Sequence, residues 1–160
     1  MQRPPPFKRI LLVEDNVNDV ELTLAALGEI HLANEVVVLR DGAEALDYLH
    51  RRGKFANRPE GLPVAVLLDL KMPKLDGLEV LRQMKSDPTL KTVPVIMLTS
   101  SREEQDLLEC YELGVNCYVV KPVGFEQFVD AVRQVGVFWA LINEPAPHHA
   151  PNDRSGSDRP

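Results

Sequence analysis

Short apolar runs alternate along the chain with longer segments in which apolar residues recur every three or four positions. The short runs are rich in Val, Leu and Ile, as is typical of strands buried on both faces of a parallel sheet. The longer segments have the period of amphipathic helices. We expect strands at 9–13, 35–39, 64–68, 95–98 and 116–120, and helices at 17–29, 43–52, 77–86, 101–113 and 125–142.

This order of elements, in which a strand is followed by a helix five times, predicts the fold class. Such alternation implies a parallel sheet joined by right-handed crossovers. We therefore expect an α/β fold, a doubly wound five-stranded sheet in the order 2-1-3-4-5 with helices on both faces. In that order the first and third strands are neighbours, and the switch point where such sheets bind ligands lies between them.

The composition predicts one domain with flanking segments that do not join its core. Residues 1–7 are a proline-rich lead-in that we expect to be mobile, and the folded domain spans 8–142. Residues 143–160 are mostly proline, histidine, serine, glycine and charged residues, so we expect a disordered tail. No segment after 142 has the pattern of an output domain, so we expect no separate enzyme. We expect either an output that passes through a partner or a role as a relay or phosphate sink.

Charge and hydropathy exclude several classes of partner. The net charge of -6 disfavours a nucleic-acid binder or an anionic-membrane binder, which would carry a basic patch. The N-terminus lacks the apolar region of a signal peptide, and no apolar run is long enough to span a bilayer. Cys110 and Cys117 lack metal-site spacing, and we interpret them as buried thiols. We expect a cytoplasmic protein.

Polar side chains follow four of the predicted strands at the point where each strand ends. Glu14 and Asp15 come after the first strand, Asp69 after the third, Thr99 after the fourth and Lys121 after the fifth. The carboxyl ends of the strands in such a sheet face one crevice, which is where ligands bind. These side chains therefore predict a site at one edge of the sheet.

The residue types at this edge indicate phosphoryl transfer. Three clustered carboxylates repel one another, so they imply a bound cation or raised pKa values, and hard oxygen ligands suit Mg²⁺. The alternative is that they are solvated loop acids. Lys121 and Thr99 offer donors for phosphoryl oxygens, although Lys121 could equally pair with Asp69 and Thr99 could be a turn residue. A carboxylate nucleophile beside these groups would form an acyl phosphate.

These residues and their order resemble the receiver domain of bacterial two-component response regulators, and the resemblance covers residues 7–142. The motifs that carry it are Glu14-Asp15, Asp69 with Met72-Pro73 and Asp76-Gly77, Thr99-Ser100 and Lys121-Pro122.

The resemblance implies a role for each acidic residue. Asp69 is the expected phosphoacceptor, which takes a phosphoryl group from a phosphohistidine of a partner sensor histidine kinase. Asp15 and Asp69 are the expected direct ligands of Mg²⁺, together with the backbone carbonyl of Lys71. Glu14 is expected to act through metal-bound water.

The resemblance also implies a switch. Lys121 and Thr99 are expected to contact the phosphoryl group. Thr99 is expected to move toward this group, while Tyr118, the aromatic residue three positions before the lysine, turns inward. These motions bias a two-state surface formed by the fourth helix, the fifth strand and the fifth helix. The Lys121–Pro122 bond is expected to be cis. The alternative for Tyr118 is an ordinary half-exposed strand residue.

The last predicted helix ends in a segment that is apolar on all sides, which one sheet face cannot bury. We expect Phe138, Trp139, Leu141 and Ile142 to form an interface, because Trp and Phe are favoured anchors there. The alternative is that the segment folds back on its own domain. This ending, the stretch at 34–42 and the long loop at 53–63 resemble the stand-alone receivers that partner bacterial phytochrome-type histidine kinases, which tend to form homodimers through the C-terminal region.

Three other functions compete with this interpretation. Phosphatases of the haloacid-dehalogenase type place an aspartate two residues after the nucleophile, where this chain has Lys71. A nucleotide or flavin binder would need a glycine-rich phosphate loop, which the sequence lacks. A degenerate receiver that binds partners without phosphorylation is the remaining alternative, and the presence of Asp15, Asp69, Thr99 and Lys121 argues against it.

Overall fold

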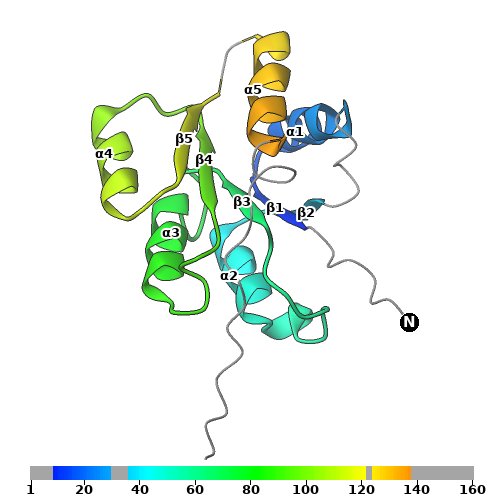
Figure 1. The fold of residues 1–160 in the computed structure, drawn as a ribbon, viewed down its shortest axis with the longest axis vertical. Helices are drawn as coiled ribbons and strands as arrows, with labels where there is room; N and C mark the ends of the chain where they lie inside the picture. The colour runs from blue at the N-terminus through cyan, green and yellow to red at the C-terminus, as the bar shows by residue number, and fades with distance from the viewer. Residues whose placement is uncertain (1–8, 30–35, 122–123, 138–160) are drawn as a thin grey trace, which may run out of the picture.

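The structure, a computed structural model, describes residues 9–29, 36–121 and 124–137. Five strands form one parallel sheet in the order β2-β1-β3-β4-β5, which confirms the predicted fold (Figure 1). The strands are β1 (Ile10–Val13), β2 (Val36–Leu39), β3 (Ala65–Leu68), β4 (Val95–Thr99) and β5 (Cys117–Val120). The helices are α1 (Val17–Glu29), α2 (Gly42–His50), α3 (Gly77–Ser86), α4 (Glu104–Glu112) and α5 (Phe125–Val137), with a short 3₁₀ helix η2 (Gly53–Phe55).

The register of the sheet aligns the carboxyl ends of the central strands. Val13 of β1 pairs with Leu39 of β2 on one side and with Leu68 of β3 on the other. Hydrogen bonds continue one residue past these pairs, because the Glu14 amide donates to the Leu39 carbonyl and the Asp69 amide donates to the Val13 carbonyl, both at 3.0 Å. The chains after β1 and β3 therefore leave the sheet side by side, which is the predicted switch point.

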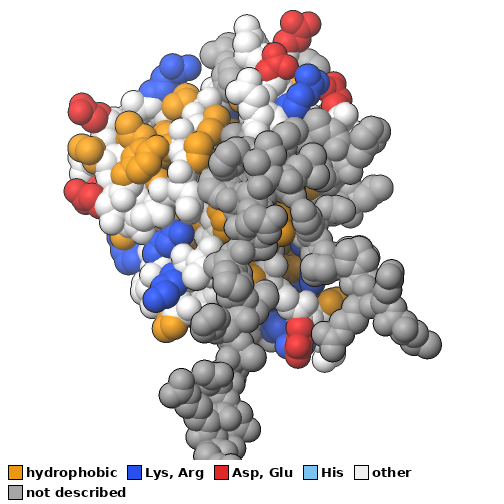
Figure 2. Space-filling model, in the orientation of Figure 1, with side chains coloured by type: hydrophobic (Ala, Val, Ile, Leu, Met, Phe, Trp, Pro, Cys, Tyr) orange, Lys and Arg blue, Asp and Glu red, His pale blue; other side chains and the backbone are white. Residues whose placement is uncertain are grey.

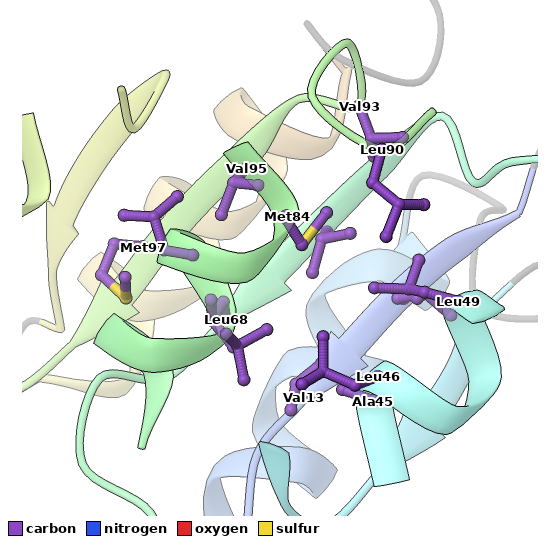
Figure 3. Packing of buried hydrophobic residues seen from close by; sticks show 14 of the residues in the cluster. Val13, Ala45, Leu46, Leu49, Leu68, Met84, Leu90, Val93, Val95 and Met97 are labelled. Carbon is purple, nitrogen blue, oxygen red and sulfur yellow. The ribbon is translucent and has the colours of Figure 1, made fainter. Parts of the chain in front are cut away.

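The three central strands of the sheet are buried on both faces, as the apolar runs predicted, and the edge strands β2 and β5 are mostly half-buried. Along β1, Ile10 and Leu12 face the side covered by α1 and α5, whereas Leu11 and Val13 face the side covered by α2, α3 and α4. Figure 3 shows the second side, where apolar side chains of β1, β3 and β4 meet those of α2 and α3. Because both faces of β1 and β3 are filled with apolar groups, polar residues on these strands are confined to their ends.

An aspartate side chain caps the start of α2 and another caps the start of α3. The Asp41 carboxylate accepts a hydrogen bond from the Glu44 amide at 2.8 Å at the start of α2. The Asp76 carboxylate accepts one from the Glu79 amide at 3.0 Å at the start of α3. Each cap satisfies a backbone donor that the helix leaves without a partner, and both helices begin within one residue of the prediction.

The start of α4 differs from the prediction. We expected Ser101 to open this helix, but α4 begins at Glu104. The Ser101 hydroxyl instead donates to the Asp106 carboxylate at 2.6 Å and accepts from the Glu103 amide at 3.3 Å. Ser101 thus bonds to the first turn of the helix from a loop that extends beyond β4.

Two further segments bear on the sequence predictions. The loop at 53–63, which we expected to be irregular, contains the 3₁₀ turn η2. The described part of α5 ends at Val137, so the predicted extension to 142 lies outside the described residues, as do the lead-in at 1–7 and the tail at 143–160.

Exposed apolar side chains gather on α4. Leu108 and Tyr111 are more than half exposed and Leu107 is also exposed. In Figure 2 hydrophobic side chains lie over α4 and β5, with acidic side chains beside them. In the part of the chain that the structure describes, none of the helices combines the length and the apolar character needed to cross a bilayer.

Candidate functional site

Three carboxylates meet at the switch point. Glu14 and Asp15 follow β1 and Asp69 follows β3, and one carboxylate oxygen of each lies within 4.8 Å of the others. The side chains of Glu14 and Asp69 are buried, whereas Asp15 is exposed to solvent. The sequence prediction that these three residues converge is therefore confirmed in its geometry.

The turn after β3 holds the backbone of Asp69 against the start of α3. The Gly77 amide donates to the Leu70 carbonyl at 2.8 Å. A Cβ atom on Gly77 would lie 2.1 Å from the Asp69 carbonyl oxygen and 2.9 Å from the Leu70 Cα. Only glycine allows this approach, so Gly77 is required for the close packing of α3 on Asp69.

Lys121 reaches this cluster from the end of β5. Its Nζ atom donates to Glu14 Oε2 at 2.9 Å and to Asp19 Oδ2 at 2.8 Å, and lies 3.9 Å from Asp69 Oδ1. The lysine side chain is only 9% exposed, so these ion pairs are shielded from solvent.

The electrostatics of the cluster are dominated by burial. Burial raises the pKa of Glu14 to about 7, with a further contribution from the charge of Asp69, although the hydrogen bond from Lys121 acts against it. Burial likewise raises the pKa of Asp69. For Lys121, burial alone would lower the pKa, but the hydrogen bonds to Asp19 and Glu14 outweigh it and the pKa is raised. The lysine is therefore charged, whereas burial makes Glu14 and Asp69 harder to ionise than free carboxyl groups.

These groups line an open cleft of about 580 Å³. It presents four acidic and two lysine side chains, together with polar residues at the start of α1 and after β4. The lining residues are Glu14, Asp15, Asn16, Val17, Asn18, Asp19, Asp69, Lys71, Ser100 and Lys121. The cleft is therefore polar and anionic, unlike the apolar pockets that hold most small organic ligands.

The donor set of the cleft fits a hard divalent cation. Carboxylate oxygens are the ligands that Mg²⁺ prefers, and Mg²⁺ keeps several waters that an open cleft can accommodate. A cation beside Glu14 and Asp69 would also favour their ionised forms, which burial now opposes.

The sequence of the chain matches the response regulator receiver domain over residues 10–133. The chain belongs to the response regulator receiver family. Receiver-family relatives include response regulators of several kinds, and the protein is accordingly a response regulator of a two-component phosphorelay. This result favours the predicted function over a phosphatase or a nucleotide binder.

Three relatives carry names that bear on its role. The chain is 41% identical to the response regulator Rcp1 of Synechocystis sp. over 134 residues, which cover 84% of this chain and 90% of Rcp1. A crystal structure of Rcp1 in its Mn²⁺-bound form has a TM-score of 0.81 to this chain. The phosphorylated cyanobacterial phytochrome response regulator RcpA has 43% identity and a TM-score of 0.81, covering 88% of this chain and 99% of that one. The bacteriophytochrome response regulator AtBRR has 64% identity and a TM-score of 0.71, covering 88% of this chain and 100% of that one.

Thr99, which we predicted to contact the phosphoryl group, does not line the cleft. It is the last residue of β4 and is buried, and its hydroxyl accepts a hydrogen bond from the Ser101 amide at 3.2 Å. The neighbouring Ser100 lines the cleft instead. The Thr99 carbonyl accepts from the Lys121 amide at 2.7 Å, so the backbone ties the two residues together at the sheet edge.

Tyr118 connects the β4–α4 loop to the core of the receiver. Its hydroxyl donates to the Ser101 carbonyl at 3.0 Å, and its ring packs against the apolar cluster between the sheet and α2, α3 and α4. Ser101 in turn bonds Asp106 of α4. A continuous set of contacts thus leads from the Thr99 hydroxyl through Ser101 to Tyr118 and α4.

Lys71 lines the cleft with an exposed side chain, and its Nζ lies 3.8 Å from Glu103 and 4.0 Å from Asp106. A ligand role for its carbonyl stays a prediction.

The predicted cis bond at Pro122 and the predicted interface of Phe138, Trp139, Leu141 and Ile142 fall outside the described residues.

Sequence reasoning assigned no role in the site to five residues that line the cleft, and Asp19 is the charged one among them. The five are Asn16, Val17, Asn18, Asp19 and Ser100. Asp19 lies in the first turn of α1, four residues after Asp15, at the same edge of the sheet. We had considered only residues at strand ends, and the first turn of the helix that follows a strand lies equally close to the switch point.

Proposed function

We propose that this response regulator accepts a phosphoryl group from a sensor histidine kinase onto Asp69 and transmits the signal through protein contacts. The observation that carries this proposal is the position of Asp69, which is buried on the cleft wall with Glu14 and Asp15 on one side and the Lys121 ammonium 3.9 Å away. A carboxylate so placed is accessible from the cleft and has cationic support for a transferred anion.

In this function a carboxylate oxygen of Asp69 attacks phosphorus, the nitrogen–phosphorus bond of the phosphohistidine breaks, and an acyl phosphate forms. Asp69 must be ionised to attack, although burial raises its pKa. Lys121 offsets the charge of the transferring oxygens through its free N–H. Asp69 is thus the nucleophile and Lys121 the electrostatic support, and the proposed function includes no enzymatic step other than this transfer.

Mg²⁺ is the proposed cofactor, held by Asp15, Asp69 and the Lys71 carbonyl, with Glu14 acting through water. When bound, Mg²⁺ supplies positive charge next to the phosphoryl oxygens and the carboxylates. Support comes from the convergence of the three carboxylates and from the Mn²⁺-bound form of the relative Rcp1.

The proposed switch consists of Thr99 and Tyr118. A phosphoryl group on Asp69 would attract the Thr99 hydroxyl and break its hydrogen bond with the Ser101 amide. Because Ser101 also bonds Tyr118 and Asp106, this change would alter the surface of α4, where Leu107, Leu108 and Tyr111 are exposed. The residues in this chain of contacts support a route from the cleft to a binding surface.

The proposed kinase is of the phytochrome type, and the proposed assembly is a homodimer through the C-terminal region that includes Phe138, Trp139, Leu141 and Ile142. The support is the likeness to RcpA and AtBRR, which are named as response regulators of a cyanobacterial phytochrome and of a bacteriophytochrome. We further propose that the protein acts in the cytoplasm without binding nucleic acid.

The experiment is incubation with acetyl phosphate, with and without Mg²⁺, read by intact-protein mass spectrometry. We expect the wild type to gain the mass of one phosphoryl group only when Mg²⁺ is present, and Asp69→Asn to gain none. An adduct that persists in Asp69→Asn would exclude Asp69 as the acceptor. A wild type that forms no adduct but still binds its kinase would support the degenerate receiver.

A further inference from the structure

The ammonium of Lys121 has two close carboxylate partners that come from different elements. Glu14 follows β1 and accepts at 2.9 Å, and Asp19 belongs to α1 and accepts at 2.8 Å. An ammonium has three N–H donors, so one remains. The next carboxylate oxygen is Asp69 Oδ1 at 3.9 Å, which is beyond hydrogen-bond distance.

Asp19 is itself held in place. Its amide donates to the Asn16 side chain at 3.1 Å, which caps the start of α1, and its carbonyl accepts from the Thr23 hydroxyl at 2.7 Å. Its side chain is 29% exposed, whereas that of Lys121 is 9% exposed. The carboxylate therefore projects from a fixed helical turn toward the buried end of a long side chain.

We propose that Asp19 is a positioning residue for Lys121, whose ammonium it holds beside Glu14 so that the third N–H stays free for the phosphoryl group on Asp69. This inference rests on the proposed function. A lysine side chain is long and has many rotamers, so two fixed acceptors are needed to define the position of its charge. Without Asp19, the ammonium is free to pair with the Asp69 carboxylate itself and to compete with the incoming phosphorus.

A simpler role is available for Asp19, because an acidic residue in the first turn of a helix is stabilising in any protein. The two roles differ in their dependence on Lys121. A positioning residue has no effect once the lysine is removed, whereas a helix-stabilising residue has the same effect with or without it. A double-mutant cycle between positions 19 and 121 separates them.

The experiment measures the rate of phosphorylation by acetyl phosphate with saturating Mg²⁺ in the wild type, Asp19→Asn, Lys121→Ala and the double variant. We expect Asp19→Asn to slow the reaction about fivefold to tenfold, and to change the rate of the Lys121→Ala protein by less than about twofold. Glu21→Gln is the matched control, because it removes an exposed charge from the same helix, and we expect it to retain the wild-type rate.

A rate that Asp19→Asn leaves unchanged or increases would overturn the inference, and so would an equal loss in both backgrounds. Binding of beryllium fluoride with Mg²⁺, followed by ¹⁹F NMR, gives a readout that needs no turnover. We expect Asp19→Asn to shift a bound fluorine resonance that Glu21→Gln leaves in place, and identical spectra would overturn the inference. A wild type that forms no adduct would remove the proposed function and this inference together, whereas a failure of the cycle alone leaves the proposed function intact.

Discussion

The two ends of the parallel sheet each contain a cationic side chain with several oxygen partners, and the two differ in what those partners are. At the carboxyl end Lys121 contacts the carboxylates of Glu14 and Asp19 and approaches that of Asp69. At the amino end, in the loop before β3, Arg58 donates mainly to backbone carbonyls, at 2.7 Å for Tyr48 and for Pro59.

Arg58 joins the end of α2 to the loop before β3. It also reaches the carbonyls of Leu49 and Gly61, and its guanidinium lies 4.3 Å from the centre of the Tyr48 ring. The Tyr48 hydroxyl accepts from Arg9 at 3.0 Å. A planar group with five donors suits this role, because it can donate at once to carbonyls of the end of α2 and of the loop.

At the carboxyl end of the sheet, the partners of the cation are carboxylates and not neutral carbonyls. Lys121 and the exposed Lys71 supply two positive charges to a cleft that contains four acidic side chains, and the pKa of Glu14 is raised to about 7. The comparison teaches that a half-buried charge with neutral acceptors fixes a loop, whereas a buried charge surrounded by an excess of carboxylates leaves a site that a further cation would stabilise.

The largest expected effect is on chemistry at the carboxyl end. We expect Lys121→Ala to slow phosphorylation by acetyl phosphate about 100-fold, because one preorganised charged donor contributes about that factor to the stabilisation of a transferring anion. Quenched-flow mass spectrometry measures the rate. The exposed Lys91 offers a control, and Lys91→Ala should retain the wild-type rate. A loss of less than threefold in Lys121→Ala would contradict the role of Lys121.

The second effect is on stability at the amino end. We expect Arg58→Ala to lower the free energy of unfolding by about 2–3 kcal/mol, because it removes the hydrogen bonds from Arg58 to four backbone carbonyls, while the phosphorylation rate stays unchanged. Urea denaturation measures the change. Arg58→Lys should lose most of this stability as well, since an ammonium cannot reproduce the planar fork.

A matched control for this experiment is Arg52→Ala, because the Arg52–Asp47 pair is exposed and should contribute less than about 1 kcal/mol. An Arg58→Ala protein as stable as Arg52→Ala, or one that loses phosphorylation, would break the distinction between the two ends of the sheet.

The third effect is a pH dependence that Glu14 confers on the metal-free protein. Its pKa is raised from 4.5 to about 7 on folding, so between these values the folded protein retains a proton that the unfolded chain has released. The free energy of unfolding of the wild type therefore falls as pH rises through this window. The fall is up to about 1.4 kcal/mol per pH unit when the wild type is compared with Glu14→Gln. Thermal melts of both proteins with EDTA measure the difference. A Glu14→Gln protein whose stability changes with pH in parallel with the wild type would contradict this assignment.

The smallest effect concerns the turn that follows Asp69. We expect Asp76→Ala to destabilise the protein by about 1 kcal/mol, because the Glu79 amide loses its cap at the start of α3. Chemical denaturation measures it, with the exposed Glu112→Ala at the end of α4 as the control. Equal stability of the two variants would show that the cap contributes nothing.

Much of the fold and part of the site could be predicted from the sequence. The apolar runs identified all five strands, because both faces of the sheet are buried, and the polar residues at their ends identified Glu14, Asp15, Asp69 and Lys121. The start of α4 was predicted wrongly at Ser101, because a serine before acidic residues has the local pattern of a cap, and its bond to Asp106 depends on tertiary packing.

Asp19 was missed for a related reason. Its partner Lys121 is 102 residues away in the sequence, and a lone acidic residue in a first helical turn has an ordinary explanation. The contact becomes visible only once the order of the strands places the end of β5 near the start of α1.

The measurement that tests the central claim most directly is the chemical location of the phosphoryl group. Acyl phosphates are reduced by borohydride to the alcohol, so an aspartyl phosphate becomes homoserine, which peptide mass spectrometry can place in the sequence. After treatment with acetyl phosphate and Mg²⁺, we expect homoserine at position 69 and at no other aspartate. Homoserine at position 15 or 19, with Asp69 unmodified, would contradict the account of the site.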